Sequence, residues 1–220
     1  MPDRDAGRRD FDKSAKSWEE NAARLKMTGA LADAVIAGLS WDPEFLAMDY
    51  GAGTGLVTLR ILPLVGRVVA VDTSPGMLAV LEEKIAKTGL KNVAVRLWDV
   101  ESDPLPAERY DVIISTMTFH HLKEIPPVLA RFHELLAPGG QMAVADLDTE
   151  AGDFHADPTG VWHFGFDREE LRSQFEASGF SRVSVSTAHR LERPGSGGQL
   201  KQFSFFLLTA AKCGLHGCWY

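Results

Sequence analysis

Three glycines at alternate positions are the feature of this 220-residue sequence that most directly suggests chemistry. Gly51, Gly53 and Gly55 stand between a short apolar segment and a helix-like one. Glycine lets a backbone turn tightly and approach a ligand without a Cβ in the way, and the free N–H groups at a helix start attract anionic groups. The spacing is G-x-G-x-G, whereas dinucleotide-binding proteins use G-x-G-x-x-G. It therefore indicates a ligand loop that is not built for a dinucleotide; the alternative is a tight turn without a ligand.

Two carboxylates follow later apolar segments. Asp72 comes directly after 67–71, where a carboxylate can accept hydrogen bonds from the hydroxyls of a ribose. Asp99 comes just after 93–97, where a carboxylate could accept a hydrogen bond from an adenine amino group. Either aspartate could instead cap a turn or helix. Because ligands of open α/β sheets bind at the carboxyl edge of the strands, the glycines and these aspartates together predict a nucleoside site.

Two adjacent histidines follow the apolar segment 110–115. His120 or His121 could act as a general base, because histidine exchanges protons near neutral pH. The alternative is that the pair caps and orients its own loop. A base must reach the proton that it removes, and sequence alone does not establish that reach.

Residues 148–166 show no periodicity but carry further candidates. His155 or His163 could act as a base there, and Phe154 or Trp162 could pack on a substrate. Histidines and carboxylates also suit zinc or iron, but their spacing matches no ligand motif, so we predict no metal site. A loop of this length is usually functional or disordered, and we expect it to wall a binding pocket.

The elements that must position these residues alternate between strand and helix. Apolar segments predict strands at 45–50, 67–71, 93–97, 110–115, 141–145, 183–187 and 203–210, and helical patterns predict helices at 14–39, 56–62, 75–88, 125–136 and 167–178. Such alternation indicates a parallel sheet covered on both faces. The connection at 193–199 leaves no room for a crossover helix, so the last two strands should pair antiparallel. We predict an α/β fold: a seven-stranded, mostly parallel, doubly wound sheet with an antiparallel last strand and an N-terminal helical cap.

Composition narrows the class of protein. The chain has 23 basic and 30 acidic residues and a net charge of −7, which disfavours a protein whose main task is to hold a nucleic-acid backbone. We expect no membrane partner, because no apolar run reaches the ~18–20 residues that span a bilayer and the charged N-terminus lacks a secretory apolar core. Both cysteines, Cys213 and Cys218, lie in the tail with His216. They build no disulfide framework, which fits a cytoplasmic location, and the cluster lacks the fourth ligand of a structural zinc site.

Five segments resemble, in order, the motifs of the class I S-adenosylmethionine-dependent methyltransferases. They are MDYGAGTGLVTL, VVAVDTSPGML, RLWDV, YDVIISTMTFHHL and LLAPGGQMAVAD, and the resemblance covers residues 44–210. It implies that family's seven-stranded sheet and S-adenosylmethionine as the cofactor. It also implies that these positions contact the cofactor: Asp49, Gly51, Ala52, Gly53, Asp72, Thr73, Met77, Asp99, Val100, Ser115, Thr116 and His120.

Within that set, the resemblance implies a particular division of labour. Gly51, Ala52 and Gly53 would hold the methionine part and Asp72 the ribose, while Thr73 and Met77 would lie by the adenosine. Asp99 and Val100 would hold and flank the adenine, and Ser115 and Thr116 would face the methyl group. Related proteins with different substrates carry a similar histidine at His120, which implies a structural or cofactor-side role there. Trp18 and Arg24 resemble a helix that covers the cofactor in some members; otherwise they are ordinary amphipathic helix residues.

The predicted organisation is a helical cap (1–43), a cofactor-binding domain (44–212) with an acceptor-side insert (148–166), and a tail (213–220). The predicted activity is transfer of a methyl group from S-adenosylmethionine to a small molecule, on an oxygen, nitrogen or carbon atom that the sequence does not identify. Nucleic acid is disfavoured as acceptor, since no Asn-Pro-Pro-Tyr sequence follows the fourth strand. Two alternatives stay open: a non-catalytic cofactor-binding scaffold and a nicotinamide-dependent oxidoreductase, the latter disfavoured by the glycine spacing. The sequence leaves the oligomeric state open.

Overall fold

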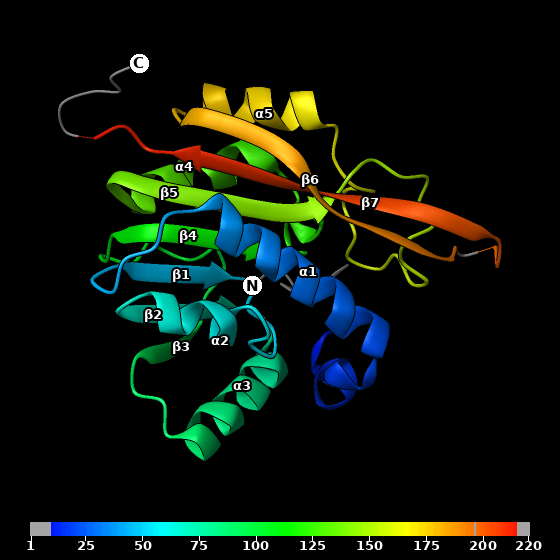
Figure 1. Ribbon diagram of the computed structural model, residues 1–220, viewed down its shortest axis with the longest axis horizontal. Helices are drawn as coiled ribbons and strands as arrows, with labels where there is room; N and C mark the ends of the chain where they lie inside the picture. The colour runs from blue at the N-terminus through cyan, green and yellow to red at the C-terminus, as the bar shows by residue number, and fades with distance from the viewer. Residues whose placement is uncertain (1–9, 196, 215–220) are drawn as a thin grey trace.

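A seven-stranded sheet forms the centre of the computed structural model, which describes residues 10–195 and 197–214 (Figure 1). The strand order is β3-β2-β1-β4-β5-β7-β6. Only β7 runs antiparallel to its neighbours β5 and β6 among these strands, and the other pairs are parallel. The strands are β1 (Leu46–Tyr50), β2 (Arg67–Asp72), β3 (Val93–Leu97), β4 (Tyr110–Thr116), β5 (Leu136–Leu147), β6 (Ser181–Pro194) and β7 (Leu200–Ala211). This confirms the predicted sheet.

Helices cover both faces of the sheet, as predicted. One face carries α1 (Ala22–Gly38), α2 (Thr58–Ile61) and α3 (Pro75–Thr88); the other carries α4 (Ile125–Leu135) and α5 (Arg168–Ala177). Successive side chains of a strand point to opposite faces. Accordingly, Val112 and Ile114 of β4 pack in the same core cluster as Leu31 of α1, while Ile113 packs with Phe132 of α4. Strands covered on both faces are apolar throughout, which explains why they were visible in the sequence.

The central strands end at the same level. Tyr50, the last residue of β1, pairs with Val71 of β2 on one side and with Ser115 of β4 on the other. Since these pairs are parallel, the loops that follow β1, β2 and β4 leave the sheet together. This register brings the glycine loop, Asp72 and the residues after Ser115 to one edge.

The N-terminal segment contains two helices where the sequence predicted one at 14–39. A 3-10 helix, η1 (Asp12–Glu20), precedes α1, and they are separated at Asn21. The Asn21 backbone is extended, with φ −84° and ψ 100°, and its side chain accepts a hydrogen bond from the Arg24 N–H at 3.0 Å. Asn21 is therefore the N-cap of a new helix. The single helix was wrong because the apolar spacing continues across this cap.

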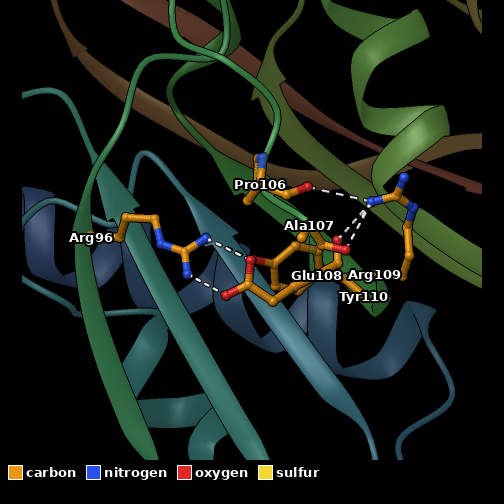
Figure 2. A network of polar contacts seen from close by, with 6 residues as sticks. All are labelled: Arg96, Pro106, Ala107, Glu108, Arg109 and Tyr110. Atoms are coloured by element: carbon orange, nitrogen blue, oxygen red, sulfur yellow. Dashed lines mark hydrogen bonds and ion pairs between the residues drawn. The ribbon is translucent and has the colours of Figure 1, made fainter.

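A loop rather than a helix covers the sheet between β3 and β4 in the described chain. Trp98 and Val100 from this loop join the core cluster beneath α4. Figure 2 shows how the loop is held: Arg96 of β3 pairs with Glu108, with Nη2 and Oε1 2.5 Å apart, and Nη1 of Arg109 donates to the carbonyls of the three residues before it. These contacts fix the path of the chain into β4.

The last two strands are longer than predicted. The register of β6 with β7 runs to Pro194 opposite Leu200, well past Phe205, where β7 leaves β5. The excess forms a two-stranded arm, 190–204, that projects beyond the sheet (Figure 1). The predicted loop at 193–199 therefore shrinks to the turn of this arm. The arm was missed because it has no second face to bury, so it lacks an apolar run.

The insert 148–166 is an ordered loop whose two ends lie together. The Thr149 N–H donates to the Phe166 carbonyl at 3.1 Å, and the Arg168 guanidinium pairs with Asp148 at 2.6 Å. Lys201 of the arm pairs with Asp153. The insert and the arm thus support each other beside the carboxyl edge of the sheet.

Two remaining expectations concern the ends and the membrane. Cys213 is described, but His216 and Cys218 of the predicted tail cluster lie outside the described residues. Among the helices that the structure describes, none has the length and apolar character needed to span a bilayer.

Candidate active site

A cavity of about 500 Å³ lies at the carboxyl edge of the sheet. Its walls come from the N-terminal cap, the glycine loop with the start of α3, the loop after β4, and the insert with the arm. It brings together these predicted residues: Trp18, Arg24, Asp49, Gly51, Ala52, Gly53, Asp72, Thr73, Met77, Thr116, His120, Phe154 and His155. The cavity therefore coincides with the edge at which ligands of open α/β sheets bind.

The glycine loop turns sharply over the end of β2. The N–H groups of Gly51 and Ala52 both donate to the Val71 carbonyl, at 2.8 and 2.9 Å. Gly51 has φ +78°, and a Cβ there would lie 2.0 Å from Oγ1 of Thr118. Gly53 has φ +54°, and a Cβ there would meet no described atom within 4 Å. Glycine is needed at the first position for packing, whereas at the second it leaves open space inside the cavity.

The carboxylate of Asp72 is oriented by backbone donors. Oδ2 accepts the Gly53 N–H at 2.7 Å and Oδ1 accepts the Ser74 N–H at 2.9 Å. Burial raises the pKa of Asp72, and these hydrogen bonds oppose that shift. Ser74 also caps α3, because its Oγ accepts the Met77 N–H at 3.1 Å. The loop, the carboxylate and the helix start therefore form one connected unit.

Asp49 lies beneath the glycine loop with only 1% of its surface exposed. Its Oδ2 accepts a hydrogen bond from Oγ1 of Thr58 at 2.6 Å. Burial raises the pKa of Asp49 to about 7, although the Thr58 hydrogen bond opposes the rise and the charge of Asp72 adds to it. The floor of the cavity thus contains two carboxyl groups whose ionisation is disfavoured by burial.

The N-terminal cap is attached to the rim of the cavity by two carboxylates. Asp12 accepts the Gly76 N–H at 2.8 Å, near the start of α3. Glu19 accepts a hydrogen bond from Oγ1 of Thr54 at 2.5 Å and pairs with Lys84 of α3. A carboxylate at a helix N-terminus is favoured by the free N–H groups there. The cap is therefore held over the glycine loop.

Aromatic and cationic side chains of the cap face the cavity. The Arg24 guanidinium carbon lies 3.8 Å from the centroid of the Trp18 ring, and Nη1 of Arg24 donates to the Trp18 carbonyl at 2.7 Å. The Phe11 ring contacts those of Trp18 and His121, with centroids 5.8 and 5.1 Å apart. Phe11, absent from the predicted site, joins the cap to the loop after β4.

His120 is buried and forms a hydrogen bond with Asp146 of β5. Nδ1 of His120 lies 2.7 Å from Oδ1 of Asp146, and the His120 N–H donates to Oδ2 at 3.4 Å. Burial acts to raise the pKa of Asp146, but the adjacent His120 holds it below the usual value. The His120 carbonyl accepts the Trp162 N–H at 2.9 Å. His120 therefore links the loop after β4 to β5 and to the insert, which favours its orienting role.

Two other histidines stand beside His120 in the cavity wall. The His155 ring centroid lies 4.8 Å from that of His120, and the His121 ring lies 4.1 Å from it. Nδ1 of His121 lies 2.6 Å from the Gly160 carbonyl oxygen. Throughout residues 10–195 and 197–214, no three His, Cys, Asp or Glu side chains gather so as to hold a metal ion.

Other predicted residues lie outside the cavity wall. Oδ1 of Asp99 accepts the Glu101 N–H at 2.9 Å, so this carboxylate caps its own loop, with Val100 buried in the core. Oγ of Ser115 donates to the Tyr50 carbonyl at 2.9 Å. The adenine and methyl-facing roles implied for these residues stay predictions.

Two aromatic residues of the insert also lie outside the wall. The Trp162 side chain is 48% exposed, and its ring lies 5.3 Å from Nζ of Lys123. The His163 ring packs at 5.0 Å against Phe166. Their backbone N–H groups contact the His120 carbonyl, but neither side chain lines the cavity, and their predicted functions are untested.

The structure adds wall residues that the sequence did not indicate. Met117 follows β4 with φ +56°, and Leu191 and Arg193 come from the arm. Leu191 and Arg193 alternate with an acidic residue, which is a weak strand signal. Arg193 lies in the segment 193–199, which the sequence predicted to be a loop, and it was therefore not predicted as a site residue.

Comparison with known proteins identifies the family. Residues 47–140 match a family model described as "Methyltransferase domain". An uncharacterized methyltransferase of Schizosaccharomyces pombe is 28% identical over 153 residues, which are 63% of this chain and 54% of the relative. Residues 47–140 are therefore a methyltransferase domain, which supports the resemblance to the class I S-adenosylmethionine-dependent methyltransferases. This match agrees with S-adenosylmethionine as the cofactor that the resemblance implied.

The chain is similar to two further methyltransferases. The arsenite methyltransferase of Halobacterium salinarum is 28% identical over 153 residues, covering 66% of this chain and 39% of the relative. A SAM-dependent methyltransferase from Aquifex aeolicus shares the fold, with a TM-score of 0.66 and 24% identity over 91% of this chain and 97% of that one. The chain spans about half the length of the curated relatives that it matches.

Proposed function

We propose that this methyltransferase transfers the methyl group of S-adenosylmethionine to a small molecule bound in the same cavity. The observation that carries the proposal is the cavity wall, which contains two unlike sets of residues: the glycine loop with Asp72, and Phe154 with His155 and Arg193. We take these two sets as the two ends of the site. The first suits a nucleoside with an amino-acid tail, and the second suits an acceptor. When bound, the cofactor supplies an activated methyl group, so the protein mainly has to position the two reactants.

The chain's residues fit the cofactor at the first end. The space beside Gly53 admits a ligand close to the backbone, and the oriented Asp72 carboxylate can accept ribose hydroxyls. Thr73 and Met77 border the same space. Oγ1 of Thr116 is buried in the wall and has no hydrogen-bond partner in the described chain. A buried hydroxyl without a partner is unfavourable, and the bound cofactor would supply one.

At the second end the acceptor binds, attacks the methyl carbon and loses its proton. A lone pair of the acceptor forms the new bond to the methyl carbon, and the electron pair of the broken carbon–sulfur bond stays on sulfur. A neutral hydroxyl or amine must then lose a proton. His155, in the wall beside Phe154, is the residue proposed to take it, while His120 positions the loop. Trp18 and Arg24 cover the site and limit access of water.

The surroundings of the cavity favour a small acceptor. The cap, residues 10–43 of the predicted 1–43, lies on one side, and the insert 148–166 lies on the other. The net charge of −7 disfavours a polyanion. We therefore assign acceptor selection to the insert and the arm, and cofactor binding to the rest of the predicted domain 44–212. The cytoplasmic location stays a prediction.

Methyl transfer from S-adenosylmethionine labelled with tritium in the methyl group tests this function. The purified protein is incubated with a panel of small alcohols, phenols, amines and carboxylic acids, and separately with bulk RNA and casein. We expect label in a small molecule, and about 10²-fold less in a His155→Ala variant if the acceptor loses a proton. Label only in RNA or casein would overturn the acceptor class. Cofactor binding without transfer to any acceptor would favour the scaffold alternative.

A further inference from the structure

A half-buried cation, Arg193, lies in the cavity wall beside Phe154 and His155. Arg193 lies in the arm, where it pairs with Lys201 of β7. Its guanidinium carbon is 4.0 Å from the centroid of the Phe154 ring and 5.3 Å from that of Phe203, and Nη2 donates to the Phe154 carbonyl. The two rings and the carbonyl are neutral, so these three contacts position the guanidinium without cancelling its charge.

One donor of this guanidinium is unused. The Nε–H of Arg193 is buried and has no hydrogen-bond partner in the part of the chain that the structure describes. Burial lowers the pKa of Arg193 and the charge of Glu150 opposes the shift, but an arginine side chain stays protonated in proteins. A buried charged donor without a partner costs free energy. A ligand in the cavity that accepts a hydrogen bond would remove this cost.

The unused donor belongs to a cation, which favours an anion as that ligand. His121 and His155 border the cavity with Arg193. Glu150 lies outside the wall, but its charge acts on Arg193. Its Oε2 accepts the backbone N–H groups of Asp153 and Phe154, at 2.6 and 3.1 Å, while its buried Oε1 has no hydrogen-bond partner in the described chain. Glu192 borders the cavity but is exposed to water, which screens its charge.

We infer that the acceptor carries an oxyanion, a carboxylate or a phosphate, which binds to Arg193. The planar guanidinium matches two oxygens of either group, and such charge-assisted hydrogen bonds are stronger than neutral ones. The aromatic rings beneath the guanidinium hold it in place, so little side-chain freedom is lost on binding. This inference rests on the proposed function, because it assigns a substrate class to the acceptor end of that cavity.

The test compares matched probes that differ in charge. Benzoate, phenyl phosphate and benzamide are titrated into the protein, with and without saturating S-adenosylhomocysteine, and their Kd values are followed by amide NMR shifts. We expect at least one anion to bind about tenfold or more tightly than benzamide. Comparing benzoate with phenyl phosphate separates a carboxylate site from a phosphate site.

Variants of two arginines on the same strand assign the effect. Arg193→Gln should abolish the preference for the anion, and Arg193→Lys should keep part of it. Arg190→Gln is the matched control, because Arg190 is exposed and outside the cavity wall; it should behave as the wild type. Equal binding of anions and benzamide by the wild type would overturn the inference. So would an Arg193→Gln protein that keeps the preference, even with a lower melting temperature, because that would reveal a purely structural clamp.

Failure of the proposed function gives a different result. Absence of S-adenosylhomocysteine binding would contradict the methyltransferase activity, whereas the titrations without cofactor report on the anion site alone. If the titrations without cofactor show a preference for the anion that depends on Arg193, they would still support the anion site.

Discussion

Two carboxyl groups, the buried Asp49 and the partly buried Asp72, lie in the cavity wall. Burial raises the pKa of both, to about 7 for Asp49. Carboxylates in such surroundings favour a cationic ligand, because a positive charge stabilises their ionised forms. S-adenosylmethionine carries a sulfonium and an ammonium group. The floor is therefore suited to the charged cofactor more than to its neutral-sulfur product.

This arrangement predicts a pH dependence of stability that involves Asp49. In the unfolded chain an aspartate titrates near about 3.9, whereas in the fold Asp49 titrates at about 7. Between these values the folded state holds a proton that the unfolded state has released. The free energy of unfolding should therefore fall as the pH rises from about 4 to 7. Above that range the whole loss of stability that comes from ionising the buried Asp49 should be present.

The Asp49→Asn variant tests this effect, because an amide keeps the shape and does not titrate. We expect urea unfolding of the ligand-free variant to show a weaker pH slope and a stability at pH 8 at least equal to that of the wild type. The slope should be reduced rather than abolished, since burial also raises the pKa of Asp72. A variant with the wild-type slope would show that Asp49 does not titrate in this range.

The sequence predicted residues of the cavity wall where the signal is local. The glycines, Asp72 and Met77 lie within 27 residues of one another, from Gly51 to Met77, and their spacing is a property of one strand–loop–helix sequence. Arg193 has no such signal, because only the folding of the arm onto Phe154 brings it to the cavity. Likewise His120 was noticed, but its partner Asp146 is 26 residues away and was not.

At the scale of elements, the glycine loop separates packing from ligand binding. A Cβ on residue 51 would clash with Thr118, while a Cβ on residue 53 would point into open space. Both positions have positive φ, which costs an alanine about 1–2 kcal/mol. The two glycines should therefore respond differently to the same substitution.

Gly51→Ala and Gly53→Ala form a matched pair. Gly51→Ala should lower the free energy of unfolding by about 3 kcal/mol, because the clash adds to the conformational cost. Gly53→Ala should cost only the conformational part but should weaken S-adenosylhomocysteine binding, because its methyl group occupies the cofactor's space. Urea unfolding and calorimetry measure the two effects. The assignment is contradicted if Gly53→Ala binds the ligand like the wild type.

Elements were predicted well where their ends carry clear signals. The predicted helix at 75–88 matches α3 because Ser74 caps it, Pro75 begins it and Gly89 ends it with φ +68°. The helix predicted across Asn21 was wrong because apolar spacing outweighed a cap signal. The arm was underestimated for the opposite reason: outside the sheet it buries too little to produce a strand pattern.

At the scale of the whole molecule, three peripheral segments meet over one edge of a regular sheet. The cap is attached through Asp12 and Glu19, the insert through the His120 carbonyl, and the arm through Lys201 and Asp153. The strand–helix alternation predicted the sheet, because strands that are buried on both faces appear in the sequence as short apolar runs. It did not predict how the segments meet, because those contacts join residues far apart in the chain.

We propose that this edge of the sheet binds S-adenosylmethionine through Asp72. Calorimetry with S-adenosylhomocysteine tests it most directly, using wild type, Asp72→Asn, and Asp33→Asn as the control, since Asp33 is exposed and pairs with Arg60 outside the cavity wall. We predict binding to the wild type and the control, and about tenfold or more weaker binding to Asp72→Asn. Equal binding by wild type and Asp72→Asn, or binding of NADH in place of S-adenosylhomocysteine, would contradict the claim.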